Sequence, residues 1–252
     1  MKRRLLSLSL RVRDLENILN FYHKTLGLHL EADPPLYHLY PEGRAFTLTL
    51  LHDPRASLRP HPSVGLYHFA LLVPNRTALG GLFLRLHQAG AYFEGAADHG
   101  VSEALYFRDP EGNGLELYRD RPPAEWPREG PLMFTLPLDL KALVQEGKTP
   151  KTLPPETQLG HIHLHVEDLA QAEAFYGQTL GMAVTLRGYP GALFFAWDGY
   201  HHHVGANIWA GRAKASEGAT GLLSYTFRAP KEVAAGRLLD PTGAEVVLLP
   251  EV

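Results

Sequence analysis

The feature that most constrains the fold of this chain is an internal duplication. Residues 11–30, RVRDLENILNFYHKTLGLHL, align without a gap over residues 165–184, HVEDLAQAEAFYGQTLGMAV, at an offset of 154 and with eight identities in twenty. A weaker pair, GLYHFALLVP at 65–74 and GLLSYTFRAP at 221–230, lies within the two halves. Self-similarity of this kind indicates a repeated structural unit, so each half is expected to contain two related units.

The first unit has a readable secondary structure. Residues 8–12 alternate apolar and polar side chains, which predicts a half-buried strand. Asp14 is expected to cap a helix that ends at Gly27, because aspartate favours the N-cap and glycine the left-handed position after the last turn. Two further strands are predicted over 36–40 and 45–51. The third unit repeats this order.

The fourth unit is shorter than the second. Asp109 follows Pro74 by 35 residues, whereas Asp240 follows Pro230 by only 10. The missing stretch is long enough for a helix and a strand. A Pro-rich linker with a short helix near 140–145 is expected between the halves.

These boundaries predict two domains. The first covers residues 1–121 and is expected to lack a full metal site. The linker covers 122–158, and the second domain, with the candidate metal site, covers 159–252.

Composition narrows the class of protein. The chain has 252 residues, 45% hydrophobic and 20% charged, with a formal net charge of -3, which is typical of a globular protein. The chain has no excess of basic residues that would favour nucleic-acid binding, and it has no apolar run long enough for a membrane span. The N-terminus does not resemble a signal peptide, so a cytoplasmic location is expected.

Histidine is the notable residue type. The chain has no cysteine and 14 histidines, so any metal site must use imidazole, carboxylate, amide or water. In HIHLHV, strand alternation puts His161, His163 and His165 on one face. If YHHHVGANIW is also a strand, His201 and His203 share a polar face. Single strand histidines are usually surface or hydrogen-bonded residues, but two clusters with matching alternation favour a metal site.

Several spaced motifs carry a family resemblance. The pattern H-x-x-L-x-V-x-D-L, followed by FY-x-x-x-LG and a later DP-x-G, resembles the vicinal oxygen chelate superfamily of glyoxalase I, extradiol dioxygenases, fosfomycin-resistance enzymes and bleomycin-binding proteins. The chain is most similar to the catechol-2,3-dioxygenase-like branch. The resemblance implies an α+β fold of four βαβββ-type modules, the fourth truncated, paired into curved mixed-sheet half-barrels.

The resemblance also implies a ligand set in the second half. His161 falls on the first-strand ligand position. His203 is the best match in the last strand of the third unit, with His201 two residues earlier on the same face. The ligand glutamate position of the family is occupied by Val247, and Glu245 lies two residues before it. The expected metal ligands are therefore His161, Glu245 and one or both of His201 and His203.

The first half offers a competing pair. His68 matches the position of His161, and Glu116 in DPEGNGLEL fits the glutamate position of the family. Ser7 and Thr47 occupy the other ligand positions there, as Ser224 does in the fourth unit. His68 and Glu116 are accordingly interpreted as a hydrogen-bonded remnant or a second ligand pocket.

The function implied by the resemblance is a metal-dependent extradiol dioxygenase that cleaves a catechol-like aromatic with O₂. Fe(II) is the preferred cofactor, with Mn(II) or Zn(II) as alternatives. His163, or whichever of His201 and His203 is not a ligand, would move protons, Tyr225 would donate a hydrogen bond, and His202 is expected to point away.

Two other functions stay open at this point, namely a glyoxalase-like lyase or isomerase and a non-enzymatic binding protein. Neither nucleic acid nor membrane is expected as a partner, and a homodimer that covers the open sheet edges is one expectation.

Overall fold

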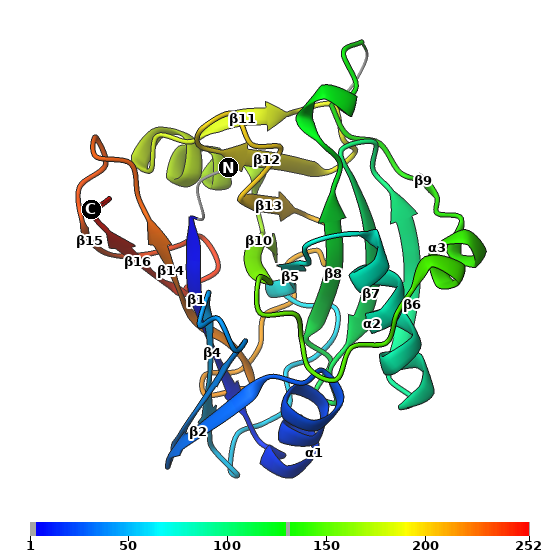
Figure 1. The fold of residues 1–252 in the computed structure, drawn as a ribbon. Coiled ribbons are helices and arrows are strands. Elements are labelled where there is room, and N and C mark those ends of the chain that lie inside the picture. The colour runs from blue at the N-terminus through cyan, green and yellow to red at the C-terminus, as the bar shows by residue number, and fades with distance from the viewer. Residues whose placement is uncertain (1–3, 130–131, 252) are drawn as a thin grey trace.

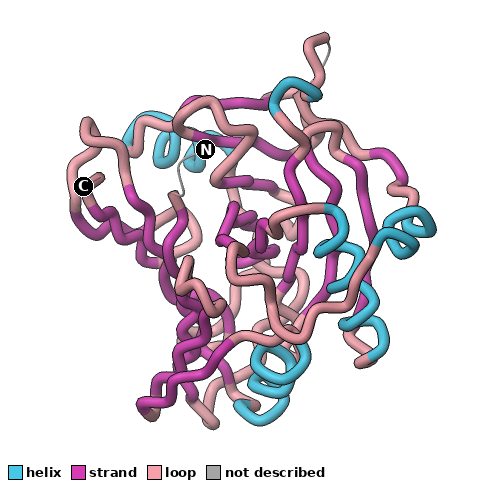
Figure 2. The backbone as a smooth tube through the Cα atoms, viewed as in Figure 1, coloured by secondary structure: helices cyan, strands magenta, loops and turns pink. Residues whose placement is uncertain are grey.

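The computed structural model describes residues 4–129 and 132–251. Two mixed β sheets form the protein, and the helices lie around and between them (Figures 1 and 2). This agrees with the predicted α+β class. In the described ranges, no helix is both long and apolar enough to cross a membrane.

The first sheet has seven strands in the order β15-β16-β14-β1-β4-β3-β2 and occupies the left side of Figure 1. Its central antiparallel pair is β1 with β14, and the parallel neighbours β4 and β16 flank that pair. The strands are β1 (Leu5–Val12), β2 (His29–Asp33), β3 (Leu36–Tyr40), β4 (Thr47–His52), β14 (Gly221–Arg228), β15 (Gly236–Leu239) and β16 (Glu245–Leu249).

The second sheet has nine strands in the order β11-β12-β13-β10-β5-β8-β7-β6-β9. It repeats the same centre, because β5 and β10 pair antiparallel and the parallel neighbours β8 and β13 flank them. The strands are β5 (Gly65–Leu72), β6 (Tyr92–Asp98), β7 (Ser102–Arg108), β8 (Gly114–Asp120), β9 (Leu136–Pro137), β10 (Gln158–His165), β11 (Ala183–Leu186), β12 (Ala192–Ala196) and β13 (Val204–Asn207).

Helices follow the first strand of three units. Asp14, Asn75 and Asp168 each accept a hydrogen bond from a first-turn backbone N–H, as N-caps do. The helical segments are α1 (Leu15–Leu19), continued by the π-helical η1 (Asn20–Thr25), α2 (Arg76–Gln88), the 3-10 turn η2 (Pro123–Glu125), α3 (Leu140–Glu146), and α4 (Leu169–Ala172), continued by the π-helical η3 (Glu173–Thr179). The predicted linker helix is α3, and the predicted stop at Gly27 has a φ of 89°.

The sheets do not divide between the two halves of the chain as the domain boundaries predict. Strands β1–β4 of the first half join β14–β16 of the second, whereas β5–β8 join β10–β13. Each sheet therefore contains strands from both 1–121 and 159–252. Inside the predicted linker, β9 adds an edge strand to the nine-stranded sheet.

Two connections carry the chain between the sheets, and they are hydrogen-bonded to each other. The segment 53–64 leads from β4 to β5, and 208–220 leads from β13 to β14. Ser57 Oγ lies 2.8 Å from Ser216 Oγ, and the N–H of Thr220 donates to the carbonyl of Ser57 at 2.9 Å. These bonds tie the two crossings to each other.

The repeated FY and DP-x-G motifs meet in space. The hydroxyl of Tyr22 donates to Oδ2 of Asp109 at 2.9 Å, and that of Tyr176 donates to Oδ2 of Asp240 at 3.0 Å. All four side chains are buried. Each tyrosine thus joins the helix of one unit to a turn in the next unit of the same half, whose strands lie in the other sheet. One continuous apolar core surrounds both bonds.

Two local predictions have different outcomes. The last unit runs from β14 to β15 and β16 with neither a helix nor a strand between β14 and β15, as its shortened spacing predicts. The strand considered over YHHHVGANIW is shorter than that segment, because β13 covers only Val204–Asn207. Asp198 and Gly199 have φ values of 59° and 69°, so the chain turns there and His201–His203 lie in the turn rather than on a strand face.

Candidate metal centre

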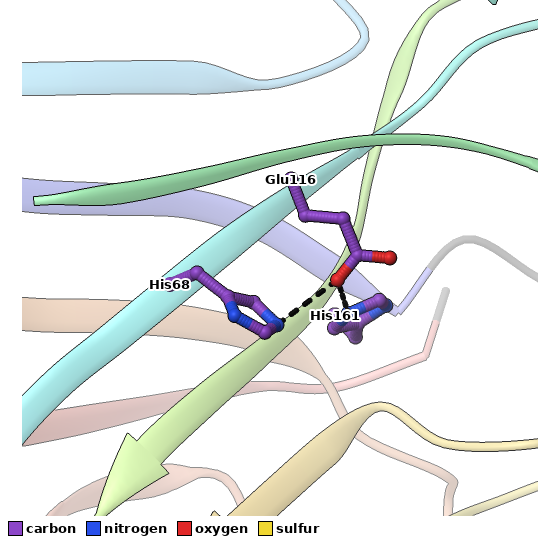
Figure 3. Close-up of side chains that lie close together, drawn as sticks. All are labelled: His68, Glu116 and His161. Carbon is purple, nitrogen blue, oxygen red and sulfur yellow. Dashed lines mark hydrogen bonds and ion pairs between the residues drawn. The ribbon is translucent and has the colours of Figure 1, made fainter. Parts of the chain in front are cut away.

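A cluster of three metal-ligand side chains lies on adjacent strands of the nine-stranded sheet. His68 comes from β5, Glu116 from β8 and His161 from β10 (Figure 3). Ala70 lies opposite both Glu116 and His161 in the strand register. The small alanine side chain leaves room for the longer ones on either side.

Glycine permits the close approach of β5 and β8 at this point. Gly114 pairs with His68. A Cβ at Gly114 would lie 2.2 Å from the carbonyl oxygen of Tyr67 and 2.8 Å from Cβ of His68. Any other residue at this position would clash with the backbone of β5 beside His68.

The donor atoms are spaced as ligands of one metal ion. Oε2 of Glu116 lies 3.0 Å from Nε2 of His68 and 3.0 Å from Nε2 of His161. Ligands bound about 2.1 Å from one ion and about 90° apart are separated by about 3 Å. The three donor atoms all lie within 4.8 Å of one another.

The orientation of His68 supports the same interpretation. Its buried Nε2 has no hydrogen-bond partner among the described residues, although the Glu116 oxygen is only 3.0 Å away. The two atoms are close, but the imidazole nitrogen is not directed at the oxygen. A cation between the donors would satisfy both, so the residues present fit a divalent metal.

Burial and charge keep the cluster ready to bind a cation. All three residues are 5% exposed or less. Burial raises the pKa of the Glu116 carboxyl, but His161 and His68 outweigh this effect and hold the pKa well below its usual range. Burial lowers the pKa of His68. A buried carboxylate beside a neutral imidazole is the donor chemistry that divalent transition metals prefer.

The cluster opens into a partly open cavity of about 200 Å³. His68 and Glu116 form part of its wall, and His163 and His202 also line it. Its other walls are mostly aromatic, and Met133 and Thr135 of the linker line it as well. The aromatic lining residues are Tyr67, Tyr106, Tyr189, Phe194 and Trp209. Such a cavity favours a flat apolar ligand with a few polar groups.

The structure does not bring together the four metal ligands expected from the sequence. His161 is in the cluster, but Glu245 lies on β16 in the other sheet and pairs with Arg237 at 3.0 Å. Nε2 of His201 lies 2.9 Å from Asp120. Nδ1 of His203 accepts a hydrogen bond from the backbone N–H of Trp197 at 3.2 Å.

The two expected catalytic residues lie in different places. His163 lines the cavity, and Nδ2 of Asn207 donates to its Nε2 at 3.0 Å. Tyr225 lies on β14 in the seven-stranded sheet, where its hydroxyl donates to Oδ2 of Asp240 at 2.8 Å. The position of Tyr225 in the core is a correction to its expected role, because its side chain is fully buried away from this cavity.

Sequence reasoning missed three features of the site. It interpreted His68 and Glu116 as a hydrogen-bonded remnant or a second ligand pocket, separate from His161, although the DPEGNGLEL motif fitted the ligand pattern of the family. It expected His202 to point away from the site, whereas His202 lines the cavity. It assigned no role to His99, whose Nε2 lies 2.7 Å from the hydroxyl of Tyr106 at the cavity wall.

Comparisons with known proteins agree with this geometry. The family model described as Glyoxalase/Bleomycin resistance protein/Dioxygenase superfamily matches residues 4–117. A catechol-2,3-dioxygenase of Bacillus subtilis (strain 168) is 44% identical over 234 residues, covering 88% of this chain and 81% of the relative. A biphenyl-2,3-diol 1,2-dioxygenase 3 of Rhodococcus globerulus is 31% identical over 120 residues, covering 46% and 63%.

One solved structure also shows the likeness in fold. Glyoxalase I of Zea mays superimposes with a TM-score of 0.59 at 16% identity, covering 99% of this chain and 92% of that one.

Proposed function

This chain belongs to the glyoxalase/bleomycin resistance protein/dioxygenase superfamily, and on that premise we propose that it is an extradiol ring-cleaving dioxygenase of catechol-like aromatics. The observation that carries the proposal is the buried His68–Glu116–His161 cluster, which opens into an aromatic-walled cavity. Two histidines and one carboxylate leave coordination positions open for other ligands. The repeated units are interpreted as four βαβββ-type modules, the fourth truncated.

In this proposal, His68, Glu116 and His161 hold the metal. Fe(II) is the expected ion, with Mn(II) or Zn(II) as alternatives. When bound, the metal would supply a positive charge that favours the deprotonated diol, with open positions for the diol and for O₂. The chain contributes the ligands, the shape of the cavity and the groups that hold protons.

The cavity orients the substrate and limits its size. Its volume of about 200 Å³ suits a single ring with small substituents. Tyr67 and Trp209 have ring centroids 5.8 Å apart and meet edge to face, so they form a rigid wall. The aromatic walls shield a bound diol from part of the bulk water, which strengthens each polar contact with the diol.

His163 is the residue that holds a hydrogen in the cavity wall in this proposal. Burial, followed by the nearby His68, holds its pKa well below the usual range, so the imidazole is neutral. Asn207 donates to its Nε2, which assigns the ring hydrogen to Nδ1. His163 is thereby held as a donor within the cavity wall.

The test uses the purified protein, reconstituted with Fe(II) without oxygen and then given catechol and O₂. We expect a yellow ring-opened product with one O₂ consumed per catechol, and loss of both in His161→Ala. Turnover without O₂ in the presence of Zn(II), Ni(II) or Mn(II) would instead indicate a glyoxalase-like lyase. Catechol binding without turnover under all these conditions would indicate a binding protein. The homodimer and the cytoplasmic location stay predictions.

A further inference from the structure

Among the three consecutive histidines at 201–203, His203 has its own hydrogen-bond partner, whereas His201 and His202 contact each other. His203 accepts a hydrogen bond from the backbone of Trp197. His201 and His202 contact each other, with their Nδ1 atoms 2.8 Å apart. Both are buried, at 0% and 7% exposure. A nitrogen-to-nitrogen hydrogen bond needs one donor and one acceptor, so the two rings have different hydrogen positions.

Asp120 decides which ring is the donor. Its Oδ1 lies 2.9 Å from Nε2 of His201, and its Oδ2 accepts a hydrogen bond from the hydroxyl of Tyr200 at 3.0 Å. A carboxylate only accepts hydrogen bonds, so Nε2 of His201 carries a hydrogen. We take His201 in its neutral form, in which the other nitrogen is bare and Nδ1 of His201 is an acceptor.

The hydrogen of His202 follows from this assignment. Its Nδ1 must donate to Nδ1 of His201, which leaves its Nε2 without a hydrogen. His202 lines the metal cavity, and its ring centroid lies 4.0 Å from that of His161. No hydrogen bond joins Nε2 of His202 to any residue in the described ranges.

We propose that Asp120 and His201 are positioning residues that hold His202 in the Nδ1–H tautomer, so that its bare Nε2 accepts a hydrogen bond from a hydroxyl of the aromatic ligand. In free histidine the Nε2–H form is favoured, so the chain from Asp120 reverses the usual preference. The identity of the ligand rests on the proposed function, whereas the tautomer is a property of the protein alone.

The positions of Asp120 and Tyr200 in the sequence place them next to His201. Asp120 is the last residue of β8, four residues after the metal ligand Glu116. Tyr200, beside His201, has its ring centroid 3.9 Å from the His201 ring, a contact that a phenylalanine ring would keep. Partners behind a functional histidine set its tautomer and orientation in this way.

The first measurement is the ¹⁵N NMR spectrum of the metal-free protein labelled at histidine, with the His202 signals assigned by their loss in His202→Asn. We expect Nδ1 of His202 to be protonated in the wild-type protein. His201→Phe removes the acceptor but keeps a ring, and Nε2–H becomes the majority form. Asp120→Asn gives a mixture, because an amide both donates and accepts.

Tyr200→Phe is the matched control. It removes the hydrogen bonds of the Tyr200 hydroxyl with Asp120 and with Tyr118 but keeps the contact between Asp120 and His201, so the tautomer of His202 stays unchanged. A wild-type His202 protonated at Nε2 would overturn the inference. So would a spectrum of His202 that is the same in His201→Phe, Asp120→Asn and wild type.

Catechol binding to the metal-free protein is the second readout. We expect His201→Phe to weaken it about tenfold, the effect of losing one buried hydrogen bond, and Tyr200→Phe to leave it within twofold. Equal affinity in His201→Phe and wild type would contradict the role of Nε2. Failure of ring cleavage in the wild type would reject the proposed reaction, but the tautomer result would still decide the role of Asp120 and His201.

Discussion

Nε2 of His161 lies 3.0 Å from Oε2 of Glu116, although the two residues belong to different halves of the chain. The antiparallel pairing of β5 with β10 brings them together, because it places one unit of each half in the same sheet. The candidate metal centre therefore depends on how the duplicated halves combine. Neither half contains it alone.

The first prediction separates Glu116 from Glu245 as a metal ligand. Glu116→Gln removes the only negative charge of the cluster and should weaken metal binding more than about 100-fold. Loss of a residue that only hydrogen-bonds to a metal ligand already lowers metal affinity about 10–100-fold. Glu245→Gln should leave metal binding unchanged, because Glu245 pairs with Arg237 in the other sheet. Isothermal titration with Mn(II) measures both. Equal losses in the two variants would contradict the assignment.

The second prediction concerns the size of the cavity. Met133 is 5% exposed and lines the cavity from the linker. Met133→Ala should raise kcat/KM for a bulky substituted catechol relative to catechol by about tenfold or more, since hydrophobic pockets discriminate by about 1–3 kcal/mol per methylene.

Leu136→Ala is the control for the cavity, because Leu136 lies on the same linker and is 54% exposed. The substrate ratio should be unaffected in this variant. A ratio that is also unaffected in Met133→Ala would show that Met133 does not limit substrate size.

The third prediction tests the buried tyrosine that joins two units. Tyr176→Phe leaves the Asp240 carboxylate with one donor fewer, since Tyr176 and Tyr225 both donate to its Oδ2. Hydrogen bonds to charged groups contribute about 1.5–3 kcal/mol, so the free energy of unfolding should fall by that amount in urea titrations. Tyr92→Phe, at a side chain that is 67% exposed, should change it by less than about 0.5 kcal/mol.

The fourth prediction concerns acid stability and His203. Burial, followed by the neighbouring His201, lowers the pKa of His203 to about 3. The unfolded chain takes up this proton near pH 6.5, so between pH 6.5 and 3 the unfolded state binds more protons. Stability from this group is present above pH 6.5 and is lost as the pH falls.

His203→Asn tests this sign, because the amide oxygen of asparagine can replace Nδ1 as the acceptor for the Trp197 N–H. Between pH 6.5 and 4, the free energy of unfolding should fall less steeply with pH in the variant than in the wild type. The difference between the two slopes should correspond to the uptake of at most one proton. The free energy of unfolding is measured by urea titration at several pH values in this range. If it changes with pH equally in both proteins, His203 is not held neutral.

Several parts of the fold follow from local patterns in the sequence. The repeated FY and DP-x-G motifs are explained by the pairs Tyr22–Asp109 and Tyr176–Asp240. The shortened spacing before Asp240 predicted the missing helix and strand. Caps and turns are read well from sequence because they depend on residues within a few positions of each other.

The site itself was predicted only in part. His161 was placed correctly on a strand beside polar neighbours, and Glu116 matched the pattern of the family, but the two were assigned to separate domains. His201–His203 were expected on a strand face because HHH before VGAN continues the alternation. The turn at Asp198 and Gly199 breaks that alternation, and turns His202 rather than His203 toward the cavity.

The sequence by itself determined the repeated units, their helices and caps, and the residue types available for a thiolate-free metal site. Only the tertiary structure decided which units share a sheet, and therefore which histidines meet Glu116. The physical reason is that a strand edge can pair with any complementary edge that the connections reach. Here the bonded crossings 53–64 and 208–220 carry the chain between the sheets, and this choice is made by contacts between residues far apart in sequence.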